Sequence, residues 1–312
     1  MRAVVLGGAG FVGSHLVDRL LARGDEVVVV DNHLTGRREN LRQHQGQPRF
    51  RLVEHDICQP IPVVGPFDAV FNLASPASPL DYARLPLETL DVGSLGTRCG
   101  LELARRAGAI FLQASTSEIY GDPLEHPQRE SYFGNVNPIG PRACYDEAKR
   151  FSETLVSTWA RVHRAPVRLA RIFNTYGPRM REEDGRVVPA FVTQALKGED
   201  FTVFGDGSQT RSFCYVDDLV KGLLLLLEKG DGNPVNLGNP VEFTLRELAE
   251  VVRRVVGKGG AVKSVCPLPE NDPKQRRPDI TRAKKLLGWE PLIPLAEGLV
   301  PTVEYYRARL KK

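Results

Sequence analysis

The fold of this chain is decided by residues 2–13, which read RAVVLGGAGFVG. A short apolar run ends at Leu6, and several glycines come closely after it. Their spacing fits Gly-x-Gly-x-x-Gly when counted from Gly8, and Gly-x-x-Gly-x-x-Gly when counted from Gly7. Residues 11–22 then have helical periodicity. We therefore predict a buried strand, a tight glycine turn and a helix, in that order.

Apolar runs and helical stretches alternate along the first half of the chain. Strands that alternate with helices favour a parallel sheet covered on both faces. The predicted fold class is therefore α/β, a Rossmann-type doubly wound parallel sheet. The further predicted strands cover residues 26–30, 49–53, 69–73, 109–113 and 167–172, and the longest predicted helices cover 85–107 and 145–163.

The pattern becomes looser after residue 173, where glycine and proline are frequent. A strand-like piece at 201–204 and a helical stretch at 245–256 indicate a smaller C-terminal α/β lobe. We expect a first domain over residues 1–173, with a return segment near 212–241, and a second lobe made mainly of residues 174–312.

The composition is that of an ordinary globular protein. The 312 residues are 42% hydrophobic and 26% charged, and the net charge of +4 is spread along the chain. We expect no nucleic-acid partner, whereas an anionic small substrate fits. The longest apolar run, residues 223–227, is too short to cross a membrane.

The five cysteines are scattered, without Cys-x-x-Cys and without histidine partners at metal spacing. We expect free structural thiols, no metal site and a cytoplasmic location, because free thiols persist in reducing compartments. The cysteines are Cys58, Cys99, Cys144, Cys214 and Cys266.

The glycine turn is the candidate cofactor site. Glycine lets the backbone approach a pyrophosphate, and the following helix offers free amides to that anion. Asp31 ends the second predicted strand, 18 residues after Gly13, where a carboxylate suits the ribose diol of NAD and repels a 2′-phosphate. Arg37 and Arg38 act against this preference for NAD over NADP. The alternative is a glycine turn that binds nothing.

Two further strand ends are candidate cofactor contacts. Asp56 and Ile57 follow the third predicted strand, and the segment Leu73, Ala74 and Ser75 follows the fourth. Ligands of open α/β sheets collect at the carboxyl ends of the strands. The alternative is that these segments are simple loops.

Tyr145 and Lys149 are four residues apart within a predicted helix and therefore share one face. A free tyrosine has a pKa near 10, too high for a base at neutral pH. We expect the neighbouring cation to lower the pKa of Tyr145, so that the phenol takes a proton from a sugar hydroxyl as hydride leaves. A solvated helix face is the alternative for this pair.

The fifth predicted strand ends in hydroxyls and a carboxylate, at Thr116, Ser117 and Glu118. Such residues often cap a following turn. The functional interpretation gives Thr116 a hydrogen bond to the reacting oxygen and leaves Ser117 and Glu118 to handle the substrate.

These motifs together resemble the extended short-chain dehydrogenase/reductase family of nucleotide-sugar enzymes, over essentially the whole chain. Within the family the chain is most similar to the UDP-glucuronate decarboxylases. The stretches that carry the resemblance are residues 72–79, 114–123, 134–142, 170–180, 184–188 and 209–213.

The resemblance implies an NAD-dependent carboxy-lyase that converts UDP-glucuronate to UDP-xylose. A 4-keto sugar would lose carbon dioxide and be protonated at C5, after which hydride would return to C4. The catalytic residues would be Tyr145, Lys149, Thr116, Ser117 and Glu118. A nucleotide-sugar 4-epimerase or 4,6-dehydratase is the nearest alternative, and a non-enzymatic NAD sensor or scaffold is an alternative of another class.

The resemblance also implies binding residues and a partner. The expected NAD site comprises Gly7, Gly10, Phe11, Val12, Gly13, Asp31, Asn32, Thr35, Gly36, Asp56, Ile57, Leu73, Ala74, Ser75, Ala114, Tyr145, Lys149, Thr175 and Arg186. The expected UDP-sugar site comprises Ser75, Thr116, Asn174, Val188, Arg211 and Arg276, with both arginines near the phosphates. A homodimer through the helices at 85–107 and 145–163 is also expected.

Two residues depart from the family pattern. Gly93 stands where the family commonly has asparagine, and Asp91 stands where relatives often have lysine or arginine. An acid at position 91 would repel a substrate carboxylate if it pointed into the site. The alternative is that Asp91 points to solvent.

Overall fold

The computed structural model describes residues 1–267 and 275–311. Its centre is a seven-stranded sheet in which all neighbouring strands are parallel. The strand order is β3-β2-β1-β4-β5-β6-β11, the doubly wound arrangement predicted from the sequence. The strands are β1 (Arg2–Leu6), β2 (Glu26–Asp31), β3 (Phe50–Glu54), β4 (Ala69–Asn72), β5 (Ile110–Thr116), β6 (Val167–Ile172) and β11 (Pro234–Leu237).

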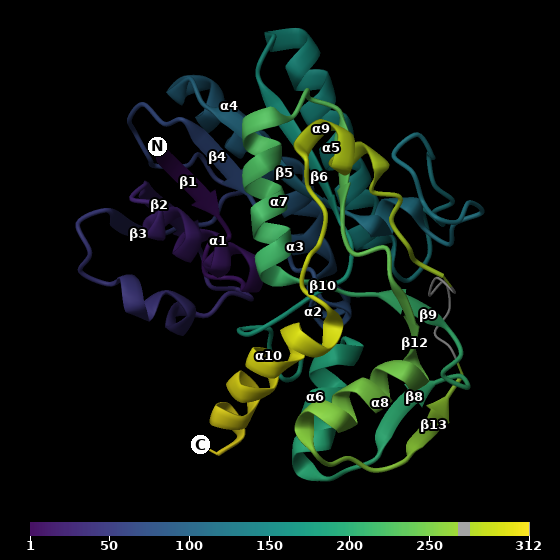
Figure 1. The fold of residues 1–312 in the computed structure, drawn as a ribbon. Coiled ribbons are helices and arrows are strands. Elements are labelled where there is room, and N and C mark those ends of the chain that lie inside the picture. The colour runs from purple at the N-terminus through teal and green to yellow at the C-terminus, as the bar shows by residue number, and fades with distance from the viewer. Residues whose placement is uncertain (268–274, 312) are drawn as a thin grey trace.

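Helices cover both faces of this sheet, and successive side chains of each strand point to opposite faces. In β1, Ala3 and Val5 enter one core cluster, whereas Val4 and Leu6 enter a second cluster. Figure 1 shows α1 and α7 beside the sheet, with α4 and α5 further back. The first core cluster includes residues of α1 (Phe11–Ala22) and α7 (Val216–Lys229), and the second includes residues of α4 (Thr97–Ala107) and α5 (Ala143–His163).

The helix predicted over residues 85–107 is confirmed. It is continuous from α3 (Pro86–Asp91) through a π-helical segment at Val92–Gly96 into α4, and the short helix α2 (Pro79–Arg84) precedes it. At the π-helical segment, Gly93 packs directly on α5. A Cβ atom at Gly93 would lie 2.7 Å from the Cβ atom of Ala148 and 2.9 Å from its carbonyl oxygen. This packing explains why position 93 has no side chain.

The remaining elements lie mostly at the end of the molecule away from the N-terminus (Figure 1). The strand predicted at 201–204 and the helix predicted at 245–256 are present as β8 (Phe201–Phe204) and α8 (Leu245–Val256). They accompany η1 (Arg38–His44), η3 (Ser117–Tyr120), β7 (Thr175–Tyr176), α6 (Val187–Lys197), β9 (Thr210–Ser212), β10 (Cys214–Tyr215), β12 (Glu242–Thr244), β13 (Val262–Cys266), α9 (Thr281–Leu287) and α10 (Leu295–Leu310).

The chain crosses between the two ends of the molecule more than once. After β8 and β9 it returns to the central sheet, where β11 pairs with β6 in parallel. Tyr306 of α10 later donates a hydrogen bond to the carbonyl oxygen of Met180. None of the helices in the described part of the chain is long and apolar enough to cross a membrane.

Candidate active site

The glycine turn between β1 and α1 closes by direct backbone contact. A Cβ atom at Gly7 would lie 2.6 Å from the backbone of Ala74, and one at Gly13 would lie 2.2 Å from the carbonyl oxygen of Gly7. A Cβ atom at Gly10 would instead meet only that carbonyl, at 3.3 Å, and would otherwise face open space. Helix α1 has no side-chain cap and no acidic residue in its first turn. Its free amides therefore favour an anion such as a pyrophosphate.

Asp31 ends β2 and reaches the glycine turn. Its carboxylate accepts hydrogen bonds from the backbone amides of Ala9, at 2.9 Å, and His33, at 2.8 Å. Gly36 lies so close that a Cβ atom there would be 3.0 Å from Asp31 Oδ1. The buried carboxylate therefore holds the turn in place and lies beside it, as a ribose contact requires.

The other residues predicted to bind NAD differ in their exposure to solvent. Ile57 and Ala114 are buried, and Asn32 and Asp56 are exposed. Thr175 uses its hydroxyl to donate to the carbonyl oxygen of Phe173 at 2.9 Å. Phe11, Val12, Thr35, Leu73, Ala74, Ser75 and Arg186 are partly buried.

Tyr145 and Lys149 lie on the buried face of α5, which excludes the solvated helix face as an interpretation of this pair. The Nζ atom of Lys149 is 5.8 Å from the centre of the Tyr145 ring. Lys149 donates a hydrogen bond of 3.0 Å to the carbonyl oxygen of Ala114, at the end of β5. The Tyr145 ring stacks on Tyr82 of α2, with ring centres 5.1 Å apart and planes inclined by 12°.

The net pKa shift of Tyr145 is opposite to the predicted one. Burial raises the pKa of Tyr145 to about 12, the charges of Glu118 and Asp146 act in the same direction, and Thr116 and Arg186 oppose them. Burial also lowers the pKa of Lys149 to about 8. The phenol is therefore neutral here, and a role as base requires additional positive charge beside it.

Glu118 lies at the centre of a cluster of buried charges at the end of β5. Arg276 makes a two-pronged ion pair with its carboxylate, including an Nη2–Oε2 distance of 2.7 Å. Arg142, at the start of α5, donates to the same Oε2 atom at 2.7 Å. Burial opposes the charged form of Glu118, but the two arginines prevail and the pKa of Glu118 is lowered. Glu118 is therefore a carboxylate at neutral pH.

Thr116 and Ser117 lie immediately before this cluster. Both are buried, and the Thr116 hydroxyl accepts a hydrogen bond of 3.3 Å from the Glu118 amide. The capping role that the sequence left open is therefore present for Thr116. The same hydroxyl also hydrogen-bonds the Tyr145 phenol and favours its charged form. The two roles are compatible because a hydroxyl has one donor and two acceptor positions.

The residues predicted to bind the UDP-sugar lie on several different elements. Arg276 is brought to Glu118, whereas Arg211 lies on β9 and donates to the carbonyl oxygen of Thr210 at 2.9 Å. Val188 is buried in the first turn of α6, and Asn174 is partly buried just before β7. Asp91 is exposed at the end of α3, so it points to solvent.

Three residues near Tyr145 were not among the predicted site residues, namely Tyr82, Arg142 and Asp146. Arg142, Asp146 and Lys149 succeed one another at spacings of four and three, which places them on one helix face. That spacing was a usable signal for Arg142 and Asp146. Tyr82 gave no such signal, because its stacking on Tyr145 is a contact between separate helices.

The arrangement suits acid–base chemistry at an alcohol beside a bound dinucleotide. Tyr145, Thr116 and Lys149 meet at the carboxyl end of β5, and the glycine turn lies at the carboxyl end of β1 in the same sheet. Among the described residues, no group of three or more His, Cys, Asp or Glu side chains is placed to hold a metal ion.

Comparison with known proteins gives consistent matches. The model of the NAD dependent epimerase/dehydratase family matches residues 3–238. A UDP-glucuronic acid decarboxylase of Arabidopsis thaliana is 54% identical over 310 residues, which cover 99% of this chain and 69% of the relative.

Two solved structures have the same fold over almost their whole length. The UDP-glucose 4-epimerase of Thermotoga maritima, with UDP-glucose, has a TM-score of 0.90 and 33% identity, covering 99% of this chain and 100% of that one. The dTDP-glucose 4,6-dehydratase DesIV of Streptomyces venezuelae, with NAD bound, has a TM-score of 0.89 and 30% identity, covering 100% and 98%.

Proposed function

The chain belongs to the NAD dependent epimerase/dehydratase family, and from that premise we propose that it is an NAD-dependent UDP-glucuronate decarboxylase that forms UDP-xylose and carbon dioxide. The observation that carries the proposal is the high identity to UDP-glucuronic acid decarboxylases along almost the whole chain. The solved epimerase and dehydratase are much less similar in sequence. All three activities begin by oxidising C4 and differ in the fate of the 4-keto sugar.

The residues around the glycine turn fit NAD. The uncapped first turn of α1 and the open space beside Gly10 suit the pyrophosphate, and Asp31 suits the adenosine ribose. Lys149 suits the nicotinamide ribose. When bound, NAD accepts the hydride from C4 and later returns it, and its positive ring favours the Tyr145 phenolate. We propose that the other residues predicted to bind NAD contact the cofactor around the edge of this NAD site.

Tyr145 takes the proton of the sugar 4-hydroxyl, and Thr116 donates a hydrogen bond to the same oxygen. Tyr145 returns its proton to that oxygen at the end of the cycle. The 4-ketone places the C6 carboxylate β to a carbonyl, so carbon dioxide leaves as an enolate forms. Ser117 and Glu118 position the sugar and handle protons beside C5.

Arg211 and Arg276 bind the substrate diphosphate, for which the guanidinium fork is suited. Asn174, Val188 and Ser75 contact the nucleotide and sugar. Arg276 contacts Glu118 in this structure, so the same arginine links the anionic substrate to the acid–base cluster. Because Asp91 is exposed, its charge does not oppose a glucuronate carboxylate in the site.

The test is incubation of the purified protein with UDP-glucuronate and without added NAD. We expect UDP-xylose, identified by its mass, together with carbon dioxide. A product of unchanged mass with inverted C4 would contradict decarboxylation and support a 4-epimerase. Loss of water from a nucleotide-glucose would instead support a 4,6-dehydratase.

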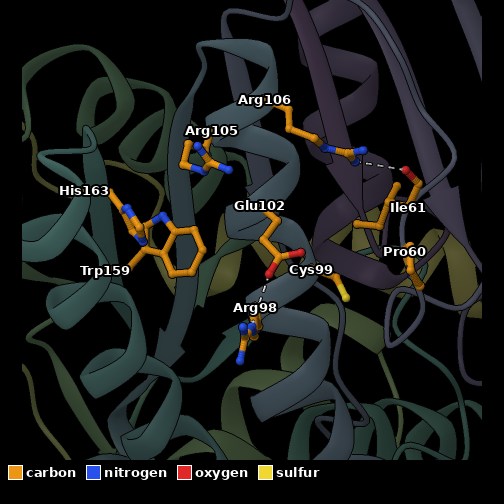
Figure 2. A pocket seen from close by; sticks show the side chains of 9 residues that line it. All are labelled: Pro60, Ile61, Arg98, Cys99, Glu102, Arg105, Arg106, Trp159 and His163. Atoms are coloured by element: carbon orange, nitrogen blue, oxygen red, sulfur yellow. Dashed lines mark hydrogen bonds and ion pairs between the residues drawn. The ribbon is translucent and has the colours of Figure 1, made fainter.

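A homodimer through α4 and α5 is a further part of the proposal. Phe151 and Val162 of α5 expose 51% and 68% of their surface, and Leu95 beside α4 exposes 50%. A cavity of about 320 Å³ lies on these helices, where Trp159 and His163 of α5 face residues of α4 (Figure 2). A second copy of the chain would cover these apolar side chains. Light scattering should give a dimer, and Phe151→Glu should give a monomer.

From the same family membership we propose two domains. The NAD-binding domain comprises residues 1–173 with a return segment near 212–241, and the nucleotide-sugar lobe comprises mainly residues 174–312. The return of β11 to the central sheet supports this division.

We also propose a cytoplasmic location. Cys58, Cys99, Cys144 and Cys214 are free thiols, which suits a reducing compartment, and the side chain of Cys266 lies outside the described residues.

A further inference from the structure

The proposed decarboxylation consumes one proton from solvent. The C5–C6 bond breaks, its electron pair passes into the enolate, and carbon dioxide leaves. C5 then gains a proton, while the proton that Tyr145 took from the 4-hydroxyl returns to the same oxygen as hydride returns to C4. The cycle therefore takes up one proton for each carbon dioxide released, and the site needs a route by which that proton enters.

Glu118 alone is poorly suited to store this proton. Its ion pairs with Arg276 and Arg142 lower its pKa, so it holds a proton too rarely at neutral pH. Once protonated, such a carboxyl gives up its proton readily and can therefore transfer it to carbon. The cluster therefore requires a neighbour that holds a proton near neutral pH and exchanges it with solvent.

Asp146 has the geometry of such a neighbour. It is only 7% exposed, and its Oδ1 atom has no hydrogen-bond partner within the described part of the chain. It lines a polar cavity of about 210 Å³, whose other walls include Arg142 and the exposed residues Asp122, Asn135 and Asn137. A cavity of that size and polarity has room for several water molecules. Asp146 therefore meets the cavity beside Arg142, which pairs with Glu118.

The charges around Asp146 favour its protonated form. Burial raises the pKa of Asp146 to about 7, the charge of Glu118 acts in the same direction, and Arg142 and Arg276 oppose both. Glu147 on the same helix also raises it. The ionisable groups that interact with Asp146 are Glu118 of η3, Arg276 before α9, Tyr82 of α2, Arg142 just before α5, and Cys144, Tyr145 and Glu147 of α5.

We propose that Asp146 is a proton relay, which takes a proton from the water of this cavity and passes it through Glu118 to C5 of the sugar. The relay rests on the decarboxylase function proposed above. Asp146 gives up one proton, Glu118 accepts it and transfers it to C5, and solvent reprotonates Asp146. No other reactant is needed.

The test is a single turnover of the NAD-containing protein with UDP-glucuronate in weak buffer with a pH indicator. Carbon dioxide release, the NADH signal and proton uptake are followed together. In Asp146→Asn we expect carbon dioxide release within about twofold of wild type, whereas NADH decay and proton uptake slow about hundredfold. Wild-type NADH decay should fall as the pH rises through 7, and this dependence should vanish in Asp146→Asn.

Two variants distinguish a relay from a structural role. Asp146→Glu keeps a carboxyl and should recover NADH decay to within about tenfold of wild type. Asp122→Asn makes the same chemical change on another wall of the cavity and should behave as wild type. Bound NAD content and the unfolding temperature of each variant report whether the fold is kept.

Equal slowing of carbon dioxide release and NADH decay in Asp146→Asn, or no slowing of either, would overturn the relay alone. A wild-type protein that releases no carbon dioxide would overturn the function and, with it, the relay.

Discussion

The glycine turn after β1 and the charge cluster after β5 lie at the carboxyl edge of the same sheet, but they consist of different chemical groups. The turn uses backbone amides and the absence of side chains, and a single carboxylate, Asp31, holds it. The cluster uses buried ionisable side chains from η3, α5 and the segment before α9. The turn is therefore sensitive to volume and the cluster to charge, so different substitutions should disable each.

The largest effect is expected at Tyr145, which lies beside the charge cluster. Tyr145→Phe keeps the ring stacked on Tyr82 but removes the phenol, so turnover should fall at least about a thousandfold while bound NAD is kept. Product formation and the NAD content of the purified variant measure the two effects. Tyr82→Phe is the matched control, since the Tyr82 hydroxyl has no hydrogen-bond partner in the described residues. Loss of NAD from Tyr145→Phe would mean that the residue has a structural role.

The next effect separates two kinds of glycine in the turn. A Cβ atom at Gly13 would collide with the Gly7 carbonyl, so Gly13→Ala should lose NAD and about 3 kcal/mol of stability. A Cβ atom at Gly10 faces mostly open space, so Gly10→Ala should keep its stability and lose only NAD affinity. Thermal unfolding and NAD titration measure both. Equal losses in the two variants would contradict the distinction.

Charge rather than volume should decide the outcome at Glu118. Glu118→Gln is nearly isosteric but removes the carboxylate charge that pairs with Arg276 and Arg142, so turnover should fall about a hundredfold. The rate of product formation measures the loss.

Glu118 should also give the fold a pH dependence. Its pKa is lower in the folded chain than in the unfolded chain, so its contribution to stability is present above about pH 4.3 and is lost as the pH falls further. Unfolding measured across acidic pH should show this loss in wild type and a weaker one in Glu118→Gln. The same acid sensitivity in both proteins would contradict the assignment.

The smallest effect is expected at Asp31. Asp31→Asn keeps an acceptor oxygen for only one of the amides of Ala9 and His33, places an NH2 group against the other, and removes the charge that repels a 2′-phosphate. NAD affinity should fall about tenfold and the preference for NAD over NADP should shrink. Titration with both dinucleotides measures this. An unchanged ratio of the two affinities would show that Asp31 only supports the turn.

The same contrast explains how far the sequence could be interpreted. The strands and the glycine turn arise from local patterns, such as the apolar run before Gly7, so the order and type of most elements were predictable. The close packing of Gly93 on Ala148 at the π-helical segment was not predictable, because it joins two helices that are far apart in the chain.

The charge cluster was only partly predictable. Glu118 and Arg276 are 158 residues apart in the chain, so no local pattern could pair them. The direction of the Tyr145 pKa shift was wrong because burial, the largest cause, is not visible in a spacing of two residues. Arg142 and Asp146 were within reach, because helical spacing places them beside Lys149.

The pairing of β11 with β6 has a consequence for synthesis of the chain on the ribosome. The strand at residues 234–237 is the last to join the central sheet, long after β6 has emerged. Until then β6 has an open edge, which is a template for pairing with another nascent chain. Truncated products that end before residue 234 should therefore aggregate, whereas those that end shortly after residue 237 should have a closed sheet.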